Sequence, residues 1–210
     1  RFNPFTPRRF TILRFLSVRW LAMLALLLAL AMSACQPIRP VATQPASQAL
    51  AAKLQNAMSA APLAIAKEAT ILDWPAKEGD AMVVLRQGTN GWTCLTDWPA
   101  SPGNDPQCND PVWTAWNDAY AKGETPEVTR PGVAYMLMGG SDPSNTEPYA
   151  TEPPPGEDWV SLPPHVMLLV PGGFDADQFT TDHHAGKPYI MWAGTPYEHL
   201  MMPLQQDASH

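Results

Sequence analysis

The stretch PYIMWAGTPYEHLMMP, from Pro188 to Pro203, contains two short apolar runs separated by Gly194-Thr195-Pro196. Apolar runs on either side of turn-forming residues predict a β-hairpin, here with strands at 189–193 and 197–202. This hairpin is the clearest pair of neighbouring strands in the chain. It favours a fold built on a mainly antiparallel sheet.

The register of this hairpin predicts a candidate metal site. Across a three-residue loop, Met191 would face His199, and Met201 would lie on the same face. The imidazole would then lie between two thioether sulfurs, a combination that soft copper accepts and hard cations do not. His183 and His184, in the segment before the hairpin, could supply further nitrogen ligands for copper or zinc.

Ordinary packing is the alternative interpretation of these residues. Their spacing matches no zinc motif, and adjacent His183 and His184 would point in opposite directions on an extended chain. Methionine also commonly fills gaps in protein cores. His165 would complete a site with His199 only if their strands are neighbours. The sequence therefore leaves open a metal site, packed or exposed loop histidines, and a catalytic role.

The chain contains none of the common catalytic motifs. It lacks Gly-x-Ser-x-Gly, a Walker A loop and Gly-x-Gly-x-x-Gly. A carboxylate pair for glycoside hydrolysis is compatible with 20 acidic residues, but no spacing singles out two of them. We therefore assign no catalytic and no cofactor-binding residue from the sequence.

Three further apolar runs predict strands that are buried on both faces. They span 81–86, 133–138 and 166–170, and turn residues flank each of them. Together with the hairpin, they predict a sheet of about five strands.

One amphipathic helix is predicted between Asp110 and Gly123. Asp110 is a suitable N-cap, Pro111 suits the first helical position, and Gly123 is a typical C-terminal stop. Trp113 and Trp116 lie on its apolar stripe. We interpret them as core residues rather than as a platform for a ligand.

Two long segments, 96–110 and 139–159, are predicted to be loops, in a chain with 24 prolines. Loops of this length in a compact domain are usually functional or mobile. Their side chains could offer oxygen ligands to calcium, although the same residue types are typical of turns. These side chains are Asp97, Asn104, Asp105, Asp142, Asn145 and Glu147.

The N-terminal region predicts export. Residues 1–19 contain five arginines and no acid, and an apolar run of about 13 residues follows at 20–32. This run is shorter than the roughly 20 residues that cross a bilayer, so a signal peptide is favoured. The run ends in Met32-Ser33-Ala34-Cys35, which resembles a bacterial lipobox with Met32 in the usual leucine position. Lipidation of Cys35 is therefore expected, with plain cleavage as the alternative.

The cysteine count is consistent with this interpretation. The chain has three cysteines, and lipidation of Cys35 would leave Cys94 and Cys108 to form one disulfide. Gln36, directly after Cys35, is similar to the residue found in lipoproteins sorted to the outer membrane.

The charge of the mature part excludes one class of partner. Beyond Cys35 there are eight basic and 20 acidic residues, a net charge of −12. Nucleic-acid binding needs clustered lysine and arginine, so we expect no nucleic-acid partner. Attachment to anionic lipid is disfavoured for the same reason, and membrane contact is expected only through the N-terminal anchor.

Four stretches resemble an uncharacterised group of bacterial secreted proteins. They are GTNGWTC (88–94), SNTEP (144–148), PPHVMLLVP (163–171) and GTPYEHLM (194–201). The resemblance covers nearly the whole folded part, and it implies no activity, substrate or catalytic residue.

These features predict a signal peptide at 1–35, a tether at 36–62 with helical character at 47–61, and a single domain at 63–210. The expected domain is α+β, with about five mainly antiparallel strands, one packed helix, long proline-rich loops and one disulfide. The expected location is the cell envelope, as an outer-membrane lipoprotein facing the periplasm, or outside the cell. The expected function is a non-catalytic binding or envelope-associated module. The alternative is a metal-dependent enzyme, or a periplasmic copper or zinc carrier that uses the C-terminal hairpin.

Overall fold

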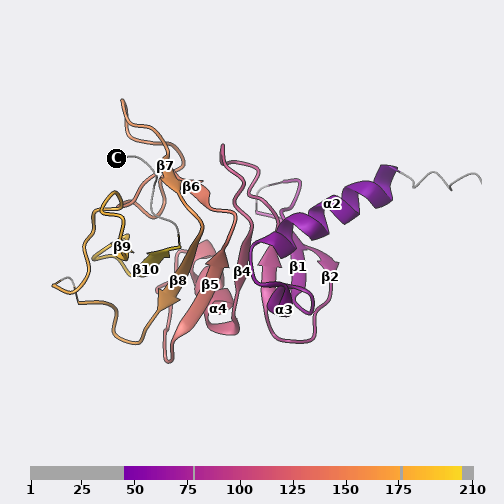
Figure 1. Cartoon of the computed structure of the whole chain (residues 1–210), viewed down its shortest axis with the longest axis horizontal. Helices are drawn as coiled ribbons and strands as arrows, with labels where there is room; N and C mark the ends of the chain where they lie inside the picture. The colour runs from indigo at the N-terminus through magenta and orange to yellow at the C-terminus, as the bar shows by residue number, and fades with distance from the viewer. Residues whose placement is uncertain (1–44, 78, 176, 205–210) are drawn as a thin grey trace, which may run out of the picture. The chain divides into compact units, whose positions relative to one another are not determined.

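The computed structural model describes residues 45–77, 79–175 and 177–204 (Figure 1). The predicted signal peptide, its lipidation site Cys35 and the tether residues 36–44 lie outside these ranges. Within them, no helix combines the length and the apolar character that a membrane span requires.

In the described residues, eight strands form one sheet in the order β2-β1-β3-β4-β5-β8-β10-β9 (Figure 1). Their bounds are β1 Thr70–Asp73, β2 Val83–Arg86, β3 Thr93–Leu95, β4 Gln107–Asn109, β5 Gly132–Met136, β8 His165–Leu169, β9 Tyr189–Met191 and β10 His199–Pro203. Neighbouring strands are antiparallel except β1 and β3, which are parallel. A two-stranded ribbon contains β6 (Gly140–Asp142) and β7 (Val160–Leu162).

The predicted α+β class and mainly antiparallel sheet are confirmed, but the predicted number of strands is too low. Strands β1, β3 and β4 have only three or four residues each, which is too short for a clear alternating pattern. Strands β4 and β6 lie inside segments that were predicted to be loops. Strand β2 is also not buried on both faces, because it is an edge strand with Val83 and Val84 exposed.

The C-terminal hairpin has the predicted register but a longer connection. Met191 pairs with His199, as the three-residue loop implied. Strand β9 ends at Met191, however, because Trp192 turns the chain with a positive φ of 54°. Within the connection, the Glu198 carboxylate accepts a hydrogen bond from the Gly194 amide at 3.0 Å. The connection therefore has a defined structure of its own.

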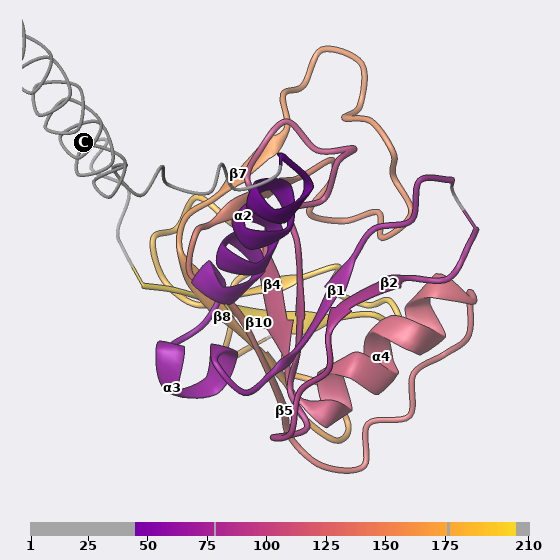
Figure 2. The same ribbon diagram turned by 90° about the vertical axis from the view of Figure 1, so that its right-hand side faces the viewer.

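Helices cover both faces of the sheet. Helix α4 (Pro111–Ala121) matches the predicted helix, and α2 (Pro45–Ser59) and α3 (Leu63–Ala66) precede the first strand. In Figure 2, α2 and α4 lie on opposite sides of β1 and β4. Side chains alternate between the faces of each strand, so each face has its own core.

The core on the α2 side is built from small residues. It contains Ala57, Ala60, Ala61, Ala66, Ala69, Ile71, Cys94 and Cys108. Alanine side chains let α2 approach the sheet closely. Cys94 and Cys108 are paired residues of β3 and β4 and form a disulfide.

This packing extends the domain toward the N-terminus. The final turn of α2 and the residues after it are buried at Ala57, Ala60 and Ala61, and the described residues from α2 onward form one compact unit. Residues 45–61 therefore belong to the domain, and the predicted boundary at residue 62 is too late. The predicted helical character at 47–61 corresponds to α2.

Candidate functional site

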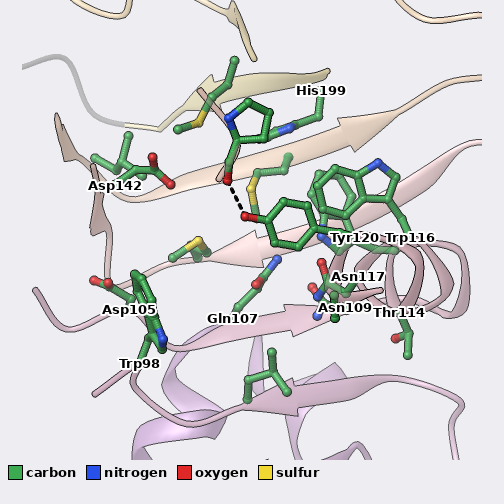
Figure 3. A pocket seen from close by; sticks show the side chains of 18 of the residues that line it. Trp98, Asp105, Gln107, Asn109, Thr114, Trp116, Asn117, Tyr120, Asp142 and His199 are labelled. Carbon is green, nitrogen blue, oxygen red and sulfur yellow. Dashed lines mark hydrogen bonds between the residues drawn. The ribbon is translucent and has the colours of Figure 1, made fainter. Parts of the chain in front are cut away.

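A cavity of about 420 Å³ lies on the α4 side of the sheet (Figure 3). Most of its lining is apolar, and tryptophan and methionine are the most frequent residue types in it. Five tryptophans and five methionines contribute: Trp74, Trp98, Trp113, Trp116, Trp192, Met82, Met136, Met167, Met191 and Met201. Pockets for small organic ligands typically have this size and this apolar character.

Local secondary structure explains which side chains reach the cavity. Helix α4 contributes Trp113, Trp116, Asn117 and Tyr120, whose spacing places them on one face of the helix. Strands contribute alternate residues, such as Gln107 and Asn109 of β4, while Cys108 between them faces the opposite core. The cavity therefore lies between one helix face and one sheet face.

Stacked rings hold one wall of the cavity in place. The Trp116 ring is parallel to those of Tyr120 and Trp192, with centroids 5.6 and 6.2 Å apart. The Tyr120 hydroxyl donates a hydrogen bond to the Pro148 carbonyl (Figure 3). Burial raises the pKa of Tyr120 to about 12, so this hydroxyl remains protonated near neutral pH. This aromatic wall of Trp116, Tyr120 and Trp192 is thus preformed.

Trp192 is fixed by two hydrogen bonds from its own donors. Its amide donates to the Asn145 carbonyl and its indole Nε1 to the Ser144 carbonyl, both at 2.9 Å. These bonds hold a non-glycine residue in the left-handed region of backbone space, which costs about 1–3 kcal/mol. Strained backbone conformations of this kind are common at functional sites.

His199 belongs to this wall. Its ring makes edge-to-face contacts with Trp113, Trp116 and Trp192, at centroid distances of 5.4, 5.7 and 5.1 Å. Burial lowers its pKa to about 4, so the ring is neutral at pH 7. Nδ1 lies 3.0 Å from the Tyr197 carbonyl, an acceptor, which assigns the ring proton to Nδ1 and leaves Nε2 as an acceptor.

Two carboxylates lie on the side of the cavity away from His199, Trp116 and Tyr120 (Figure 3). Asp105 and Asp142 come from the two long segments that were predicted to be loops. Asp105 Oδ1 accepts a hydrogen bond from the Ser141 amide at 3.1 Å, which joins these segments.

The environment of both carboxyl groups favours the protonated form. Burial raises the pKa of Asp105, the negative charge of Asp97 adds to this rise, and the Ser101 hydroxyl opposes it. Burial raises the pKa of Asp142 to about 6, the Ser144 amide opposes this rise, and the charge of Asp105 adds to it. Asp142 therefore changes its charge close to neutral pH.

Buried polar atoms without a partner concentrate around this cavity. Among the described residues, six buried side-chain atoms make no hydrogen bond of ordinary geometry, and four belong to residues that line the cavity. These four are Asp105 Oδ2, Asn109 Oδ1, Trp113 Nε1 and Ser141 Oγ. Such atoms are rare in folded proteins, so their concentration here calls for an explanation.

The predicted histidine set does not assemble around the cavity. His183 and His184 lie in a turn with ring centroids 3.9 Å apart, so they do not point in opposite directions as on an extended strand. Of the three, only His199 lines the cavity. The described ranges contain no group of three His, Cys, Asp or Glu side chains arranged to hold a metal ion. His199 does lie between Met191 and Met201 on one face, as the register predicts.

His165 meets the condition for sharing a site with His199, which is that their strands are neighbours. Its strand β8 is a neighbour of β10, so His165 and His199 share a face of the sheet. His165 does not line the cavity, however, and its Nδ1 lies 2.7 Å from the Pro163 carbonyl. Burial lowers its pKa to about 4, so it too is neutral at pH 7.

The loop oxygens proposed for calcium are mostly occupied elsewhere. Asp97 accepts a hydrogen bond from the Asp105 amide, and Asn104 accepts one from Asn56. Asn145 is an exception, because its side-chain nitrogen donates to the Thr181 carbonyl while its Oδ1 is buried without a partner. Only Asp105 and Asp142 of the predicted set line the cavity.

Several cavity residues escaped the sequence patterns. Gln107 and Asn109 lie on a three-residue strand that the patterns do not predict. Trp113 and Trp116 are buried, as expected, but they also line the cavity. The helical spacing of Trp113, Trp116 and Tyr120 is the sequence signal from which an aromatic wall could have been inferred.

Comparisons with known proteins add no evidence on function, so the function is inferred from this geometry. No protein-family model matches the sequence, and neither the curated proteins nor the solved structures show significant similarity to it.

Proposed function

We propose that the folded domain is a binding module that takes a small, partly apolar organic molecule into the cavity. The observation that carries this proposal is the coincidence of a preformed aromatic wall with four buried polar atoms that lack partners. An apolar cavity can stay empty, but unpartnered polar atoms favour an occupant that satisfies them.

The size and chemistry of the cavity support useful affinity. At about 25 cal/mol per Å², burial of roughly 200 Å² of apolar ligand surface contributes about 5 kcal/mol before the cost of immobilising the ligand. The aromatic wall is already ordered, so little further ordering opposes binding.

We place this module at the cell envelope. The signal-like region at 1–35 and the lipobox-like Cys35 support export and anchoring. The Cys94–Cys108 disulfide is consistent with an oxidising compartment. In this proposal the anchor holds the domain at the outer membrane, where it binds its ligand from the periplasm.

The carboxylate pair supports a second candidate, acid–base hydrolysis of a glycoside. Glycosidases use two carboxyl groups, one of which has a raised pKa and acts as the acid. The raised pKa of Asp142, to about 6, and the neighbouring Asp105 fit such a pair. Aromatic rings such as Trp98 offer stacking surfaces for a sugar.

The proposal can be tested by screening small molecules for stabilisation of the purified protein. A true ligand should raise the melting temperature, because binding to the folded state adds about 2.7 kcal/mol at a concentration of 100 Kd. Trp98→Ala should weaken that ligand at least tenfold, because half-buried Trp98 lines the cavity. Trp92→Ala is the matched control, since Trp92 is also half-buried but packs on the opposite core.

The same variants separate the two candidates. The binding module is supported if the protein binds a ligand but does not cleave aryl glycosides, and if only Trp98→Ala loses that binding. Release of the aryl group that disappears in Asp142→Asn would support the hydrolase. A library of several thousand compounds that yields no ligand sensitive to Trp98→Ala would contradict both.

A further inference from the structure

We infer that the ligand of this cavity is an organic cation with N–H donors, such as an amine, whose charged end lies at Asp105 and Asp142 and whose apolar body lies along the tryptophans. This inference rests on the proposed binding function and specifies the chemical class of the ligand.

The charge of the cavity excludes anions and favours cations. Its lining contains Asp105, Asp118 and Asp142, but no lysine or arginine. His199 is neutral at pH 7 and adds no positive charge. The mature part of the chain carries −12, so the long-range field also attracts cations.

Two residues that line the cavity each have a buried acceptor without a donor. Asp105 is only 7% exposed, and its Oδ2 accepts no hydrogen bond of ordinary geometry. Asn109 is 1% exposed, and its Oδ1 also lacks a donor. The Asn109 side chain is neutral, so its missing donor is an observation independent of the two carboxyl groups. A ligand with N–H groups would supply donors to these atoms, whereas a purely apolar ligand would leave them unsatisfied.

The remaining two unpartnered atoms concern the part of the ligand away from its charged group. Trp113 Nε1 is a donor only, so it requires an acceptor such as a hydroxyl or carbonyl oxygen. Ser141 Oγ can donate or accept and sets no further condition. The cavity therefore fits a cationic group at one end, and an acceptor on the apolar body would add affinity without being needed for the preference for cations.

An aromatic ring lies beside the carboxylates. Figure 3 shows Trp98 next to Asp105, and the Trp98 ring is 6.4 Å from that of Trp74. Tryptophan faces attract cations, and a neighbouring carboxylate strengthens the attraction. The same surfaces would also hold the methylene groups of an amine.

The raised pKa values of the carboxyl groups agree with a missing positive charge. Burial opposes ionisation of Asp105 and Asp142, and no lysine or arginine in the lining compensates. A bound cation would favour the ionised forms. Binding should therefore weaken as the pH falls through about 6 and Asp142 takes up a proton.

Calorimetric titration with three probes of matched shape tests this inference. The probes are tryptamine, its neutral alcohol analogue tryptophol, and the anion indole-3-propionate. We expect tryptamine to bind at least tenfold more tightly than either analogue at pH 7.5, and this preference to shrink at least threefold at pH 5. Asp105→Asn and Asp142→Asn should each reduce the preference at least threefold. Asp158→Asn, which changes an exposed carboxylate outside the cavity, is the control.

The outcomes separate this inference from the proposal beneath it. If tryptophol binds as tightly as tryptamine and Trp98→Ala weakens both, the cation inference is wrong and the cavity still binds organic molecules. If none of the three probes binds in a way that depends on Trp98, the cation inference is wrong, and the compound screen decides separately whether the cavity binds organic molecules. Circular dichroism of each variant shows whether it has folded, and the isosteric asparagines keep the shape of the carboxylates.

Discussion

At the scale of single residues, buried titratable groups make the stability of this domain depend on pH in two opposing ways. Burial raises the pKa of Asp142 from 3.8 to about 6. The stability that its protonated form contributes is therefore complete below about pH 4 and is lost as the pH rises through 6. Burial lowers the pKa of His165 and His199 from 6.5 to about 4. The stability that these neutral imidazoles contribute is present above pH 6.5 and is lost as the pH falls toward 4.

We expect Asp142→Asn to stabilise the protein at high pH. The substitution removes a buried charge, and each unit of pKa shift corresponds to about 1.4 kcal/mol, so the free energy of unfolding at pH 8 should rise by about 1–3 kcal/mol. Asparagine retains the oxygen that accepts the Ser144 amide at 2.9 Å. Urea denaturation at pH 8 and pH 4.5 measures the effect, which should be smaller at the lower pH. An equal gain at both values, or a gain in Asp158→Asn, would contradict the explanation.

At the scale of secondary-structure elements, one carboxylate joins α4 to the sheet. Asp110 Oδ1 accepts a hydrogen bond from the Trp113 amide at 2.8 Å, and Oδ2 accepts one from the Val133 amide at 3.0 Å. Asp110 thus caps α4 and fixes its start against β5. The position of the aromatic wall on α4 depends on this connection.

Asp110→Ala should lower the free energy of unfolding by about 1–3 kcal/mol, because it removes the cap and leaves the Val133 amide without its acceptor. Equilibrium denaturation in urea measures the loss. Asp118→Ala changes an exposed residue of the same helix and should stay within about 0.5 kcal/mol of the wild type. If the two variants lose equal stability, the cap is not the cause.

The disulfide is a second element-scale connection, between β3 and β4. Replacing Cys94 and Cys108 with serine should cost about 2–4 kcal/mol. Gln107 and Asn109 flank Cys108 on β4 and line the cavity, so ligand affinity should fall as well. Thermal melting with and without a reducing agent measures the first effect, and titration of a ligand found by screening measures the second. A reduced protein with unchanged melting temperature and affinity would show that the strand pair needs no crosslink.

At the scale of the whole molecule, the two faces of the sheet have different compositions. The α2 face holds a compact core of alanines and the disulfide. The α4 face holds bulky aromatic and methionine side chains that pack less completely and leave the cavity. One face therefore supplies close packing, and the other supplies the site.

In the proposed envelope location the anchor is Cys35, which lies outside the described residues. Cys35→Ser should move the protein from the membrane fraction to the soluble periplasmic fraction and abolish incorporation of radiolabelled palmitate. Cell fractionation and labelling measure this outcome. Retention of the serine variant in the membrane with a cleaved signal would show that another contact anchors it.

The parts of this fold that depend on local sequence could be predicted. The cap and stop residues around Asp110 and Gly123 define α4, and the register of the hairpin that pairs Met191 with His199 follows from strand alternation. The short strands β3 and β4 could not be predicted, because three residues carry too little periodicity. They exist because neighbouring strands supply hydrogen bonds on both sides.

By itself, the sequence determined the fold class, the main helix, the hairpin register and the cysteine pair, because each depends on residues close together in the chain or on composition. Only the tertiary structure decided the site. It brings Asp105 and Asp142 together from separate segments, and it places them in the same cavity as the rings of α4 and His199 of β10. The physical reason is that a cavity is a gap left by packing between distant elements, and no local pattern of residues encodes such a gap.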